Sequence, residues 1–218
     1  MSLALSFPLP PSLHRRRRRG NPLCRSRASA AASVGVMREV KLKPIEATPE
    51  TFRDFGQVIE ASPDGDVFGP KDAQLDLSRG IPRFYIMHLE DRPLKFSDIT
   101  HHASVTQCLG SIGGHPWYLG VAKPSIAAPG EVKDEATENL KQSWCGHFYV
   151  PPALDDVYVF RISGSKFVKL HWGTWHAGPL FRADKMDFYN LELSNTNVVD
   201  HTLHSFVKEN EVVFLIDE

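Results

Sequence analysis

The sequence predicts an all-β fold, a single antiparallel β-barrel with one or two short helices. The first observation behind this prediction is a series of short apolar stretches of strand length, separated by Gly, Pro and Asp turn signals. Such spacing is typical of antiparallel sandwiches and barrels. The second observation is size, because 218 residues with 42% hydrophobic content can bury one core but are few for two sizeable domains.

Residues 1–36 form a separate segment that is rich in Ser, Ala, Pro and Arg. They contain seven arginines, including the run from Arg15 to Arg19, and the first acidic residue of the chain is Glu39. This composition predicts a cleaved organellar transit peptide, and the uncharged first dozen residues favour the plastid over the mitochondrion. The arginine run also fits a nuclear-localisation or RNA-binding arm. The folded domain is expected to span residues 37–218.

The rest of the chain is acidic. Without the seven arginines of the first segment, 18 basic residues stand against 26 acidic ones, a net charge near −8. An acidic body argues against nucleic acid as a partner. No apolar run approaches the roughly 20 residues of a membrane span, so no membrane partner is expected. Cys24, Cys108 and Cys145 fit neither a zinc cluster nor a disulfide framework, which predicts buried thiols in a reducing compartment.

The folded domain is expected to begin with a strand over residues 40–45. Thr48, Pro49 and Glu50 then predict a short helix, because a hydroxyl cap, a proline and an acid suit a first helical turn. Turns and loops are expected at residues 62–70, 163–165 and 123–141, the last as a polar surface insertion with a short helix near 135–140. Further strands are expected at residues 82–88, 104–110, 117–122, 147–150, 157–162, 167–172, 188–194 and 212–216.

Residues 167–181 carry the densest chemistry. A strand turns at Gly173, and His176 follows directly after Trp175, before a second turn at a Gly-Pro pair. Histidine is a usual metal ligand and acid–base group. A single histidine in a tryptophan-rich turn is equally compatible with a structural role in the core.

The upstream residues His102, Gln107 and Gly114 follow one another at intervals of five and seven residues. With Gly173 and His176, this order resembles the two half-motifs of the cupin superfamily, His-x-His-x(3–4)-Glu-x(6)-Gly and Pro-x-Gly-x-x-His. In that fold the two motifs lie on neighbouring strands of a small barrel and direct their ligands into its mouth. The chain departs from these motifs by having Thr100 for the first histidine, Gln107 for the glutamate and His171 for the proline.

The interval between His102 and Gln107 is odd, so a regular strand would direct the two side chains to opposite faces. A bend or bulge near Ser104 is therefore expected, because it would direct both side chains into the barrel. A purely structural alternative is that His102 and Gln107 form a hydrogen-bonded polar pair beneath a loop.

A closer resemblance covers nearly all of residues 37–218. Residues 42–60 resemble the opening of the ureidoglycolate lyases, long called ureidoglycolate hydrolases. Other segments of that family resemble, in the same order, residues 102–110, 117–124, 157–160, 173–176 and 187–188. The chain departs from the family at Ala177, where a histidine is usual, in the insertion 123–141 and in the tail from Asn195.

The resemblance implies a cupin-type barrel, a homodimer, and a lyase that splits ureidoglycolate into glyoxylate and urea in purine and allantoin nitrogen breakdown. It also implies a divalent metal held by His102, Gln107 and His176, with no organic cofactor. A metal chelated by the substrate carboxylate and hydroxyl lowers the pKa of that hydroxyl. The amide of Gln107 brings no charge, so we expect weak metal binding that Gln107→Glu would tighten.

The same reaction suggests roles for other residues. Catalytic roles are expected for His176, His171 and Asp187, with a histidine tuned near neutrality as the base and Asp187 orienting a histidine. Substrate-binding roles are expected for Lys169, Arg161 and Arg83, which offer cations to the carboxylate, and for Trp175 as a pocket wall. Lys169 and His171 alternate along one strand and must share a face, either lumen or solvent. His201 and His204 are expected at the surface.

Two other functions fit the same residues. One is a cupin enzyme that acts on another small hydroxy or keto acid. The other is a non-catalytic cupin that binds a small carboxylate as a sensor or carrier. Turnover of a ureido acid by the purified protein separates these functions from the lyase.

Overall fold

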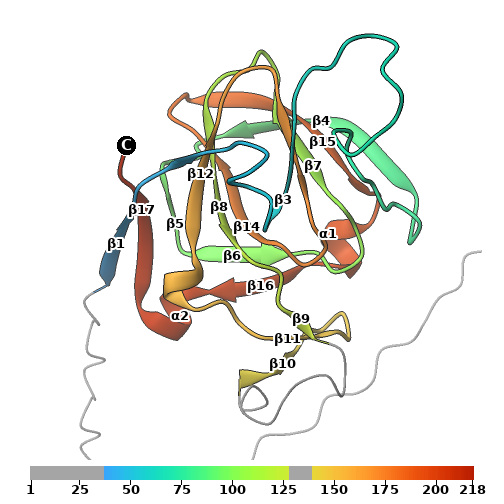
Figure 1. Cartoon of the computed structure of the whole chain (residues 1–218). Coiled ribbons are helices and arrows are strands. Elements are labelled where there is room, and N and C mark those ends of the chain that lie inside the picture. Colours follow the sequence, from blue (N-terminus) through green and yellow to red (C-terminus); the bar gives the residue numbers. More distant parts are fainter. Residues whose placement is uncertain (1–36, 128–138) are drawn as a thin grey trace, which may run out of the picture. The chain divides into compact units, whose positions relative to one another are not determined.

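The structure is a computed structural model of the chain, and it describes residues 37–127 and 139–218. Strands dominate these ranges, and the helices are short (Figure 1). The expected β-rich fold is therefore confirmed. The expected transit peptide, and most of the helix expected near 135–140, lie outside the described residues. No helix in the described ranges is long and apolar enough to cross a membrane.

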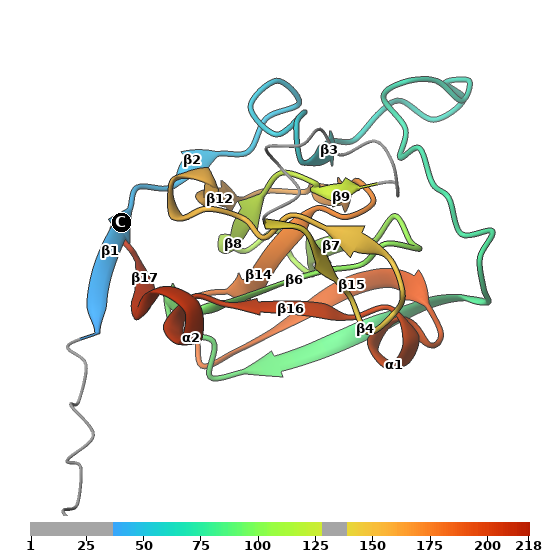
Figure 2. The same cartoon turned by 90° about the horizontal axis from the view of Figure 1, so that it is seen from below.

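The elements follow one another along the chain with short connections. The first half contains β1 (Arg38–Leu42), β2 (Ile45–Glu46), β3 (Gly56–Ile59), β4 (Pro82–Glu90), β5 (Lys95–Phe96), β6 (Asp98–His101), β7 (Cys108–Ser111), β8 (Trp117–Ala122) and β9 (Ile126–Ala127). The second half contains β10 (Lys141–Gln142), β11 (Phe148–Tyr149), the 3₁₀ turn η2 (Leu154–Asp156), β12 (Tyr158–Ile162), β13 (Phe167–Leu170), β14 (Trp175–Leu180), β15 (Lys185–Leu193), α1 (Thr196–Val199), β16 (Thr202–Ser205), α2 (Phe206–Asn210) and β17 (Val212–Ile216). Figure 2 shows β16 running between the two helices.

The described strands form four sheets. A six-stranded sheet has the order β16-β6-β14-β8-β12-β2, and a five-stranded sheet has the order β3-β13-β7-β15-β4. Two three-stranded sheets, β1-β17-β5 and β10-β11-β9, complete the fold. Most pairs are antiparallel, while β1 with β17 and β12 with β2 are parallel.

The single closed barrel expected from the sequence is not what these sheets form. Within residues 37–127 and 139–218 no ladder joins the six-stranded sheet to the five-stranded sheet. Their inner faces are filled with large side chains such as Trp117, Phe160 and Phe188. Facing sheets packed over such side chains stand about 10 Å apart, roughly twice the spacing of hydrogen-bonded strands. The two large sheets therefore face each other as separate layers.

Strand alternation explains the core. Along β8, Trp117, Leu119 and Val121 join the cluster between the two large sheets. The intervening Tyr118 and Ala122 belong to a second cluster on the other face of the six-stranded sheet, where β17 and α2 supply Phe206 and other apolar side chains. Both faces of β8 are thus covered, which is why this strand is apolar throughout.

Three local expectations need correction. Thr48 does cap the following turn, since the Thr51 N–H donates to Thr48 Oγ1 at 3.2 Å, but residues 49–55 form turns instead of a helix. The strand expected over 104–110 begins only at Cys108, because the preceding backbone bends at Ala103 and Ser104, as the spacing of the histidine motif requires. Residues 175–180, expected as a turn region, form strand β14.

Candidate functional site

A cavity of about 400 Å³ lies between the two large sheets, beside β6 and β14. His102, Gln107 and His176 all line it, so the structure brings together the three residues that the sequence grouped as metal ligands. They come from the bend after β6, the residue before β7 and the second residue of β14. Polar lining residues that the sequence did not single out include Tyr85, Arg92, Asn190, Glu192 and His201.

The orientation of His176 is set by its neighbours along the chain. Its ring Nδ1 lies 3.1 Å from the carbonyl oxygen of Thr174. A carbonyl only accepts hydrogen bonds, so Nδ1 carries the proton and Nε2 keeps a lone pair. Thr174 is itself fixed, because its hydroxyl donates to the carbonyl oxygen of Phe55 at 2.8 Å.

His102 is held in the same way by a distant segment. Its ring Nδ1 donates to the carbonyl oxygen of Asp200, which again leaves a lone pair on Nε2. The carboxylate of Asp200 accepts the N–H groups of Ala103 and Ser104, both at 2.7 Å, and so fixes the bend that follows His102. Asp200 therefore orients both the ring and the backbone of this residue.

A backbone hydrogen bond links the two histidine segments. The N–H of Gly173 donates to the carbonyl oxygen of His102 at 2.8 Å. Gly173 has a φ of +73°, and a Cβ there would lie 2.6 Å from the Ile126 side chain. Both the left-handed backbone and the close contact favour glycine. The ring centroids of His102 and His176 are 5.2 Å apart.

Burial keeps both imidazoles neutral. It lowers the pKa of His176 to about 3, and the nearby His102 adds to the effect. Burial also lowers the pKa of His102, although the Asp200 carbonyl opposes the shift. A neutral imidazole with a free Nε2 is the form that binds metals. The same low pKa makes His176 a weak base, so the expectation of a histidine base tuned near neutrality does not suit this residue.

Gln107 has one satisfied end and one unsatisfied end. Its Nε2 donates to Asn190 Oδ1 at 3.1 Å and to Glu192 Oε2 at 3.3 Å. The amide must point this way, because the opposite orientation would place its oxygen against a carboxylate and an amide oxygen. Its Oε1 is buried without a hydrogen-bond partner among the described residues. A buried unpaired oxygen is costly, and a ligand cation would satisfy it.

Glu192 is a buried acid at the centre of this network. Only 2% of it is exposed, and its Oε1 accepts from the Tyr85 hydroxyl at 3.3 Å. Arg83 approaches the same oxygen at 3.5 Å and stacks its guanidinium 3.6 Å from the Tyr85 ring. Arg83, expected to bind the substrate carboxylate, does not line the cavity, and its guanidinium is paired with this internal carboxylate. Arg92, by contrast, lines the cavity and does not belong to any ion pair of the described residues.

Two of the cavity residues that the sequence analysis did not identify could have been found from their spacing. Asn190 and Glu192 are polar residues at a spacing of two within the strand expected over 188–194, which indicates one shared face. His201, expected at the surface, lines the cavity with its ring centroid 5.7 Å from that of His102. His204 was also wrongly placed at the surface, since it is buried against Phe206. The cause is β16, which the sequence did not predict.

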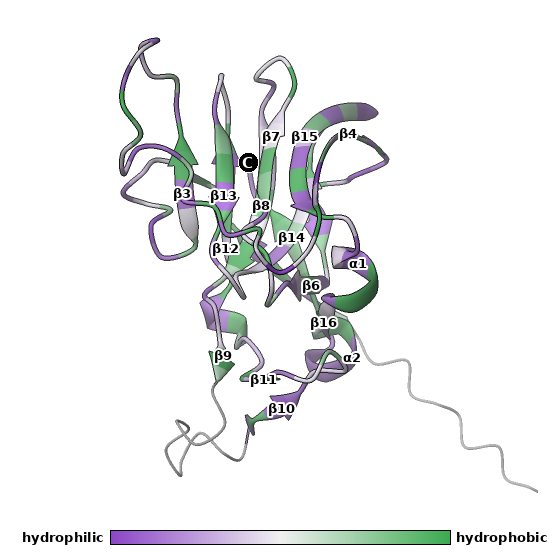
Figure 3. Ribbon diagram, turned by 90° about the vertical axis from the view of Figure 1, so that its right-hand side faces the viewer, coloured by the Kyte–Doolittle hydropathy of each residue, from purple (hydrophilic) through white to green (hydrophobic). Residues whose placement is uncertain are grey.

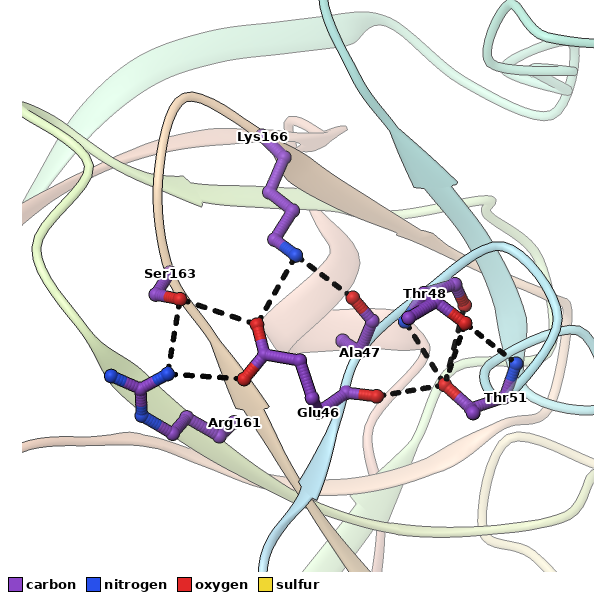
Figure 4. A network of polar contacts seen from close by, with 7 residues as sticks. All are labelled: Glu46, Ala47, Thr48, Thr51, Arg161, Ser163 and Lys166. Atoms are coloured by element: carbon purple, nitrogen blue, oxygen red, sulfur yellow. Dashed lines mark hydrogen bonds and ion pairs between the residues drawn. The ribbon is translucent and has the colours of Figure 1, made fainter.

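Asp187 and Arg161 lie away from this cavity, at a separate one of about 630 Å³. Asp187 does orient a histidine, but that residue is His88, whose Nδ1 is 2.6 Å from Asp187 Oδ1. Arg161 donates to Glu46 at 3.0 Å and to Ser163 at 3.1 Å (Figure 4). The structure therefore does not group Asp187 and Arg161 with His176. Asp187 lies an odd number of residues from Asn190 and Glu192 on β15, so its side chain is on the opposite face of the strand.

Lys169, His171 and Trp175 also point away from the cavity. Lys169 and His171 share a face, as expected, with 3.4 Å between Nζ and Nδ1, but this is the outer face of the five-stranded sheet. The alternating residues Val168 and Leu170 point to the inner face of the same sheet. Trp175 is fully buried on the far side of the six-stranded sheet, where its Nε1–H donates to Ser125 Oγ at 2.9 Å.

His102, Gln107 and His176 carry donor atoms of the kinds that hold divalent metals, and all three line this cavity. The donors would be Nε2 of His102, Nε2 of His176 and Oε1 of Gln107, the last of which is otherwise unsatisfied. Counting only His, Cys, Asp and Glu, the described part of the chain holds no group of three side chains arranged as metal ligands. Gln107 falls outside that count, because its donor is an amide oxygen.

Comparison with protein-family models finds no match for this chain, and comparison with curated proteins finds none either.

Proposed function

We propose that the chain is a metal-dependent lyase that splits ureidoglycolate into glyoxylate and urea. The observation that carries the proposal is the pair of neutral imidazoles, each with Nδ1 fixed by a carbonyl, beside the unpaired oxygen of Gln107 in one polar cavity. A divalent metal bound there would supply a Lewis acid for the substrate hydroxyl. The resemblance of residues 42–60 and 173–176 to the ureidoglycolate lyases supports the choice of substrate.

The residues around the three donors suit the remaining needs of this reaction. The substrate carboxylate requires a cation, and Arg92 lines the cavity without an ion-pair partner in the described ranges. The elimination moves the hydroxyl proton to the ureido nitrogen while the carbon–nitrogen bond breaks. His201 can accept and return this proton, because it lines the cavity and its buried Nδ1 lacks a hydrogen-bond partner among the described residues.

A second candidate function is a non-catalytic carboxylate-binding protein with the same site. A related enzyme acting on another small hydroxy or keto acid would use the same donors. Arg92 would bind the carboxylate in every case, so the functions differ in the identity of the acid and in whether it is turned over.

The deciding experiment is an assay of glyoxylate and urea release by the purified protein, with and without added divalent metal and chelator. We expect metal-dependent turnover that is lost in His176→Ala and retained in the control His115→Ala, since His115 is an exposed histidine outside this cavity. Arg92→Met should raise KM more than it lowers kcat. Full turnover in His176→Ala, or no turnover of any ureido acid with metal present, would contradict the lyase proposal.

We also propose a homodimer and an organellar, preferably plastid, location. The dimer is supported by apolar side chains on the outer face of β4 and β15, where Phe84 is 70%, Ile86 61% and Tyr189 46% exposed. Size-exclusion chromatography with light scattering tests it, and Phe84→Glu should give a monomer. The location rests on the composition of residues 1–36.

A further inference from the structure

Lys169 is a buried amine that the proposed lyase site does not use. Only 5% of it is exposed, and it lies on β13 with its Nζ directed to the outer face of the five-stranded sheet. Figure 3 shows β13 between β3 and β7 in this sheet. An open cleft of about 600 Å³ reaches it there, walled by Phe68, Pro70 and Gln74. The amine is therefore largely desolvated yet accessible to a small molecule.

Within residues 37–127 and 139–218, no carboxylate pairs with the amine of Lys169. Its partner across the ladder to β7 is Cys108, and burial raises the pKa of that thiol to about 12, so the thiol remains uncharged. A buried ammonium without a counter-ion is unfavourable, and burial accordingly lowers the pKa of Lys169. The lack of a counter-ion and the burial both favour the neutral, nucleophilic form of the Lys169 amine.

His171 provides a base for this amine. Its Nε2 lies 3.1 Å from the carbonyl oxygen of Arg53, which only accepts, so Nε2 carries the proton in the neutral ring. The lone pair is then on Nδ1, which lies 3.4 Å from Lys169 Nζ. A nucleophile, a base with a free lone pair and a third group that orients the base form the arrangement used in nucleophilic catalysis.

We propose that Lys169 and His171 form a second reactive site, which captures small aldehydes as an imine of Lys169. The Nζ lone pair attacks the carbonyl carbon while the carbonyl π electrons move to oxygen, and His171 Nδ1 takes a proton from nitrogen. That proton passes to the oxygen to give the carbinolamine. Loss of hydroxide, and of the remaining nitrogen proton to it, gives one imine and one water. The step consumes no oxidant or reductant, and it is independent of the proposed lyase activity.

Lys166, which directly precedes β13, is a matched control. Its side chain is 13% exposed, but its amine lies 3.3 Å from Glu46 and donates to the carbonyl oxygen of Ala47 at 2.9 Å (Figure 4). The two lysines thus lie close together in the chain, are both poorly exposed and differ in their partners. Reactive trapping compares them within one molecule, so it does not depend on whether any variant folds.

The test treats the full chain with a low concentration of acetaldehyde and sodium cyanoborohydride, then measures N-ethylation of each lysine by peptide mass spectrometry. We expect Lys169 to be labelled about tenfold or more faster than Lys166, because a lowered pKa increases the neutral fraction of an amine. His171→Phe should slow labelling of Lys169 by about tenfold or more and leave Lys166 unchanged, since general-base help contributes factors of this size. Labelling of Lys169 no faster than Lys166, or unaffected by His171→Phe in a variant with the wild-type circular dichroism spectrum, would overturn the proposal.

Discussion

Replacing Asp200 by asparagine tests how much the site depends on the segment after α1. The carboxylate is 3% exposed and accepts two N–H groups at 2.7 Å, one on each oxygen. Hydrogen bonds to charged groups contribute about 1.5–3 kcal/mol each, against about 1 kcal/mol for neutral ones. Asparagine keeps one oxygen, so one bond becomes neutral and the other N–H faces an NH₂ group. We therefore expect the free energy of unfolding to fall by about 2–4 kcal/mol.

Urea denaturation followed by tryptophan fluorescence measures this change. Asp155→Asn is the control, because Asp155 is exposed and accepts no side-chain hydrogen bond among the described residues. The variant should also bind divalent metal about tenfold or more weakly, since groups that orient a ligand contribute that much. A loss in stability below about 0.5 kcal/mol, the range of ordinary surface substitutions, would refute the idea that Asp200 fixes the bend after His102.

Gln107→Glu places a second carboxylate beside Glu192, so the two acids should share a proton. Isothermal titration calorimetry should therefore show tighter metal binding than wild type at pH 8 but little gain at pH 6. An equal gain in affinity at both pH values would contradict this. Asp187 raises the pKa of His88, so the stability this pair contributes is present below the ordinary histidine pKa of about 6.5 and is lost as pH rises through the folded value. An NMR titration should show a lower His88 midpoint in Asp187→Asn, and an unchanged midpoint would refute the assignment. A fluorescent reporter fused to residues 1–40 should enter an organelle, and a diffuse cytosolic or nucleolar signal would exclude the transit peptide.

The sequence predicted the fold class because turn signals and apolar stretches are local features. The strands 117–122 and 212–216 match β8 and β17 in both bounds. The sequence did not predict β14 or β16, since their residues read as turns and polar tail until the pairing with β6 is known. Closure of the barrel could not be judged either, because it depends on how far large core side chains hold two sheets apart.

The intervals between residues predicted part of the site. The interval from His102 to Gln107 predicted a bend correctly, whereas the alternation of Lys169 and His171 left open which face of the sheet they occupy. His102 and Gln107 required a bend, and the structure has it at Ala103 and Ser104. Lys169 could have been excluded from the cavity, because Val168 and Leu170 on either side are apolar and occupy the inner face. The role of Asp200 could not be predicted, since nothing local links it to a histidine 98 positions earlier.

That long separation has a consequence for the order in which the protein matures. A ribosome releases His102 and Gln107 well before His176, and Asp200 comes later still. Until Asp200 has emerged, the ring of His102 lacks the carbonyl that accepts its Nδ1–H. If the proposed metal binds, its loading therefore has to follow the synthesis of the segment after α1. A chain truncated before residue 200 should accordingly retain less divalent metal than the complete chain under the same conditions.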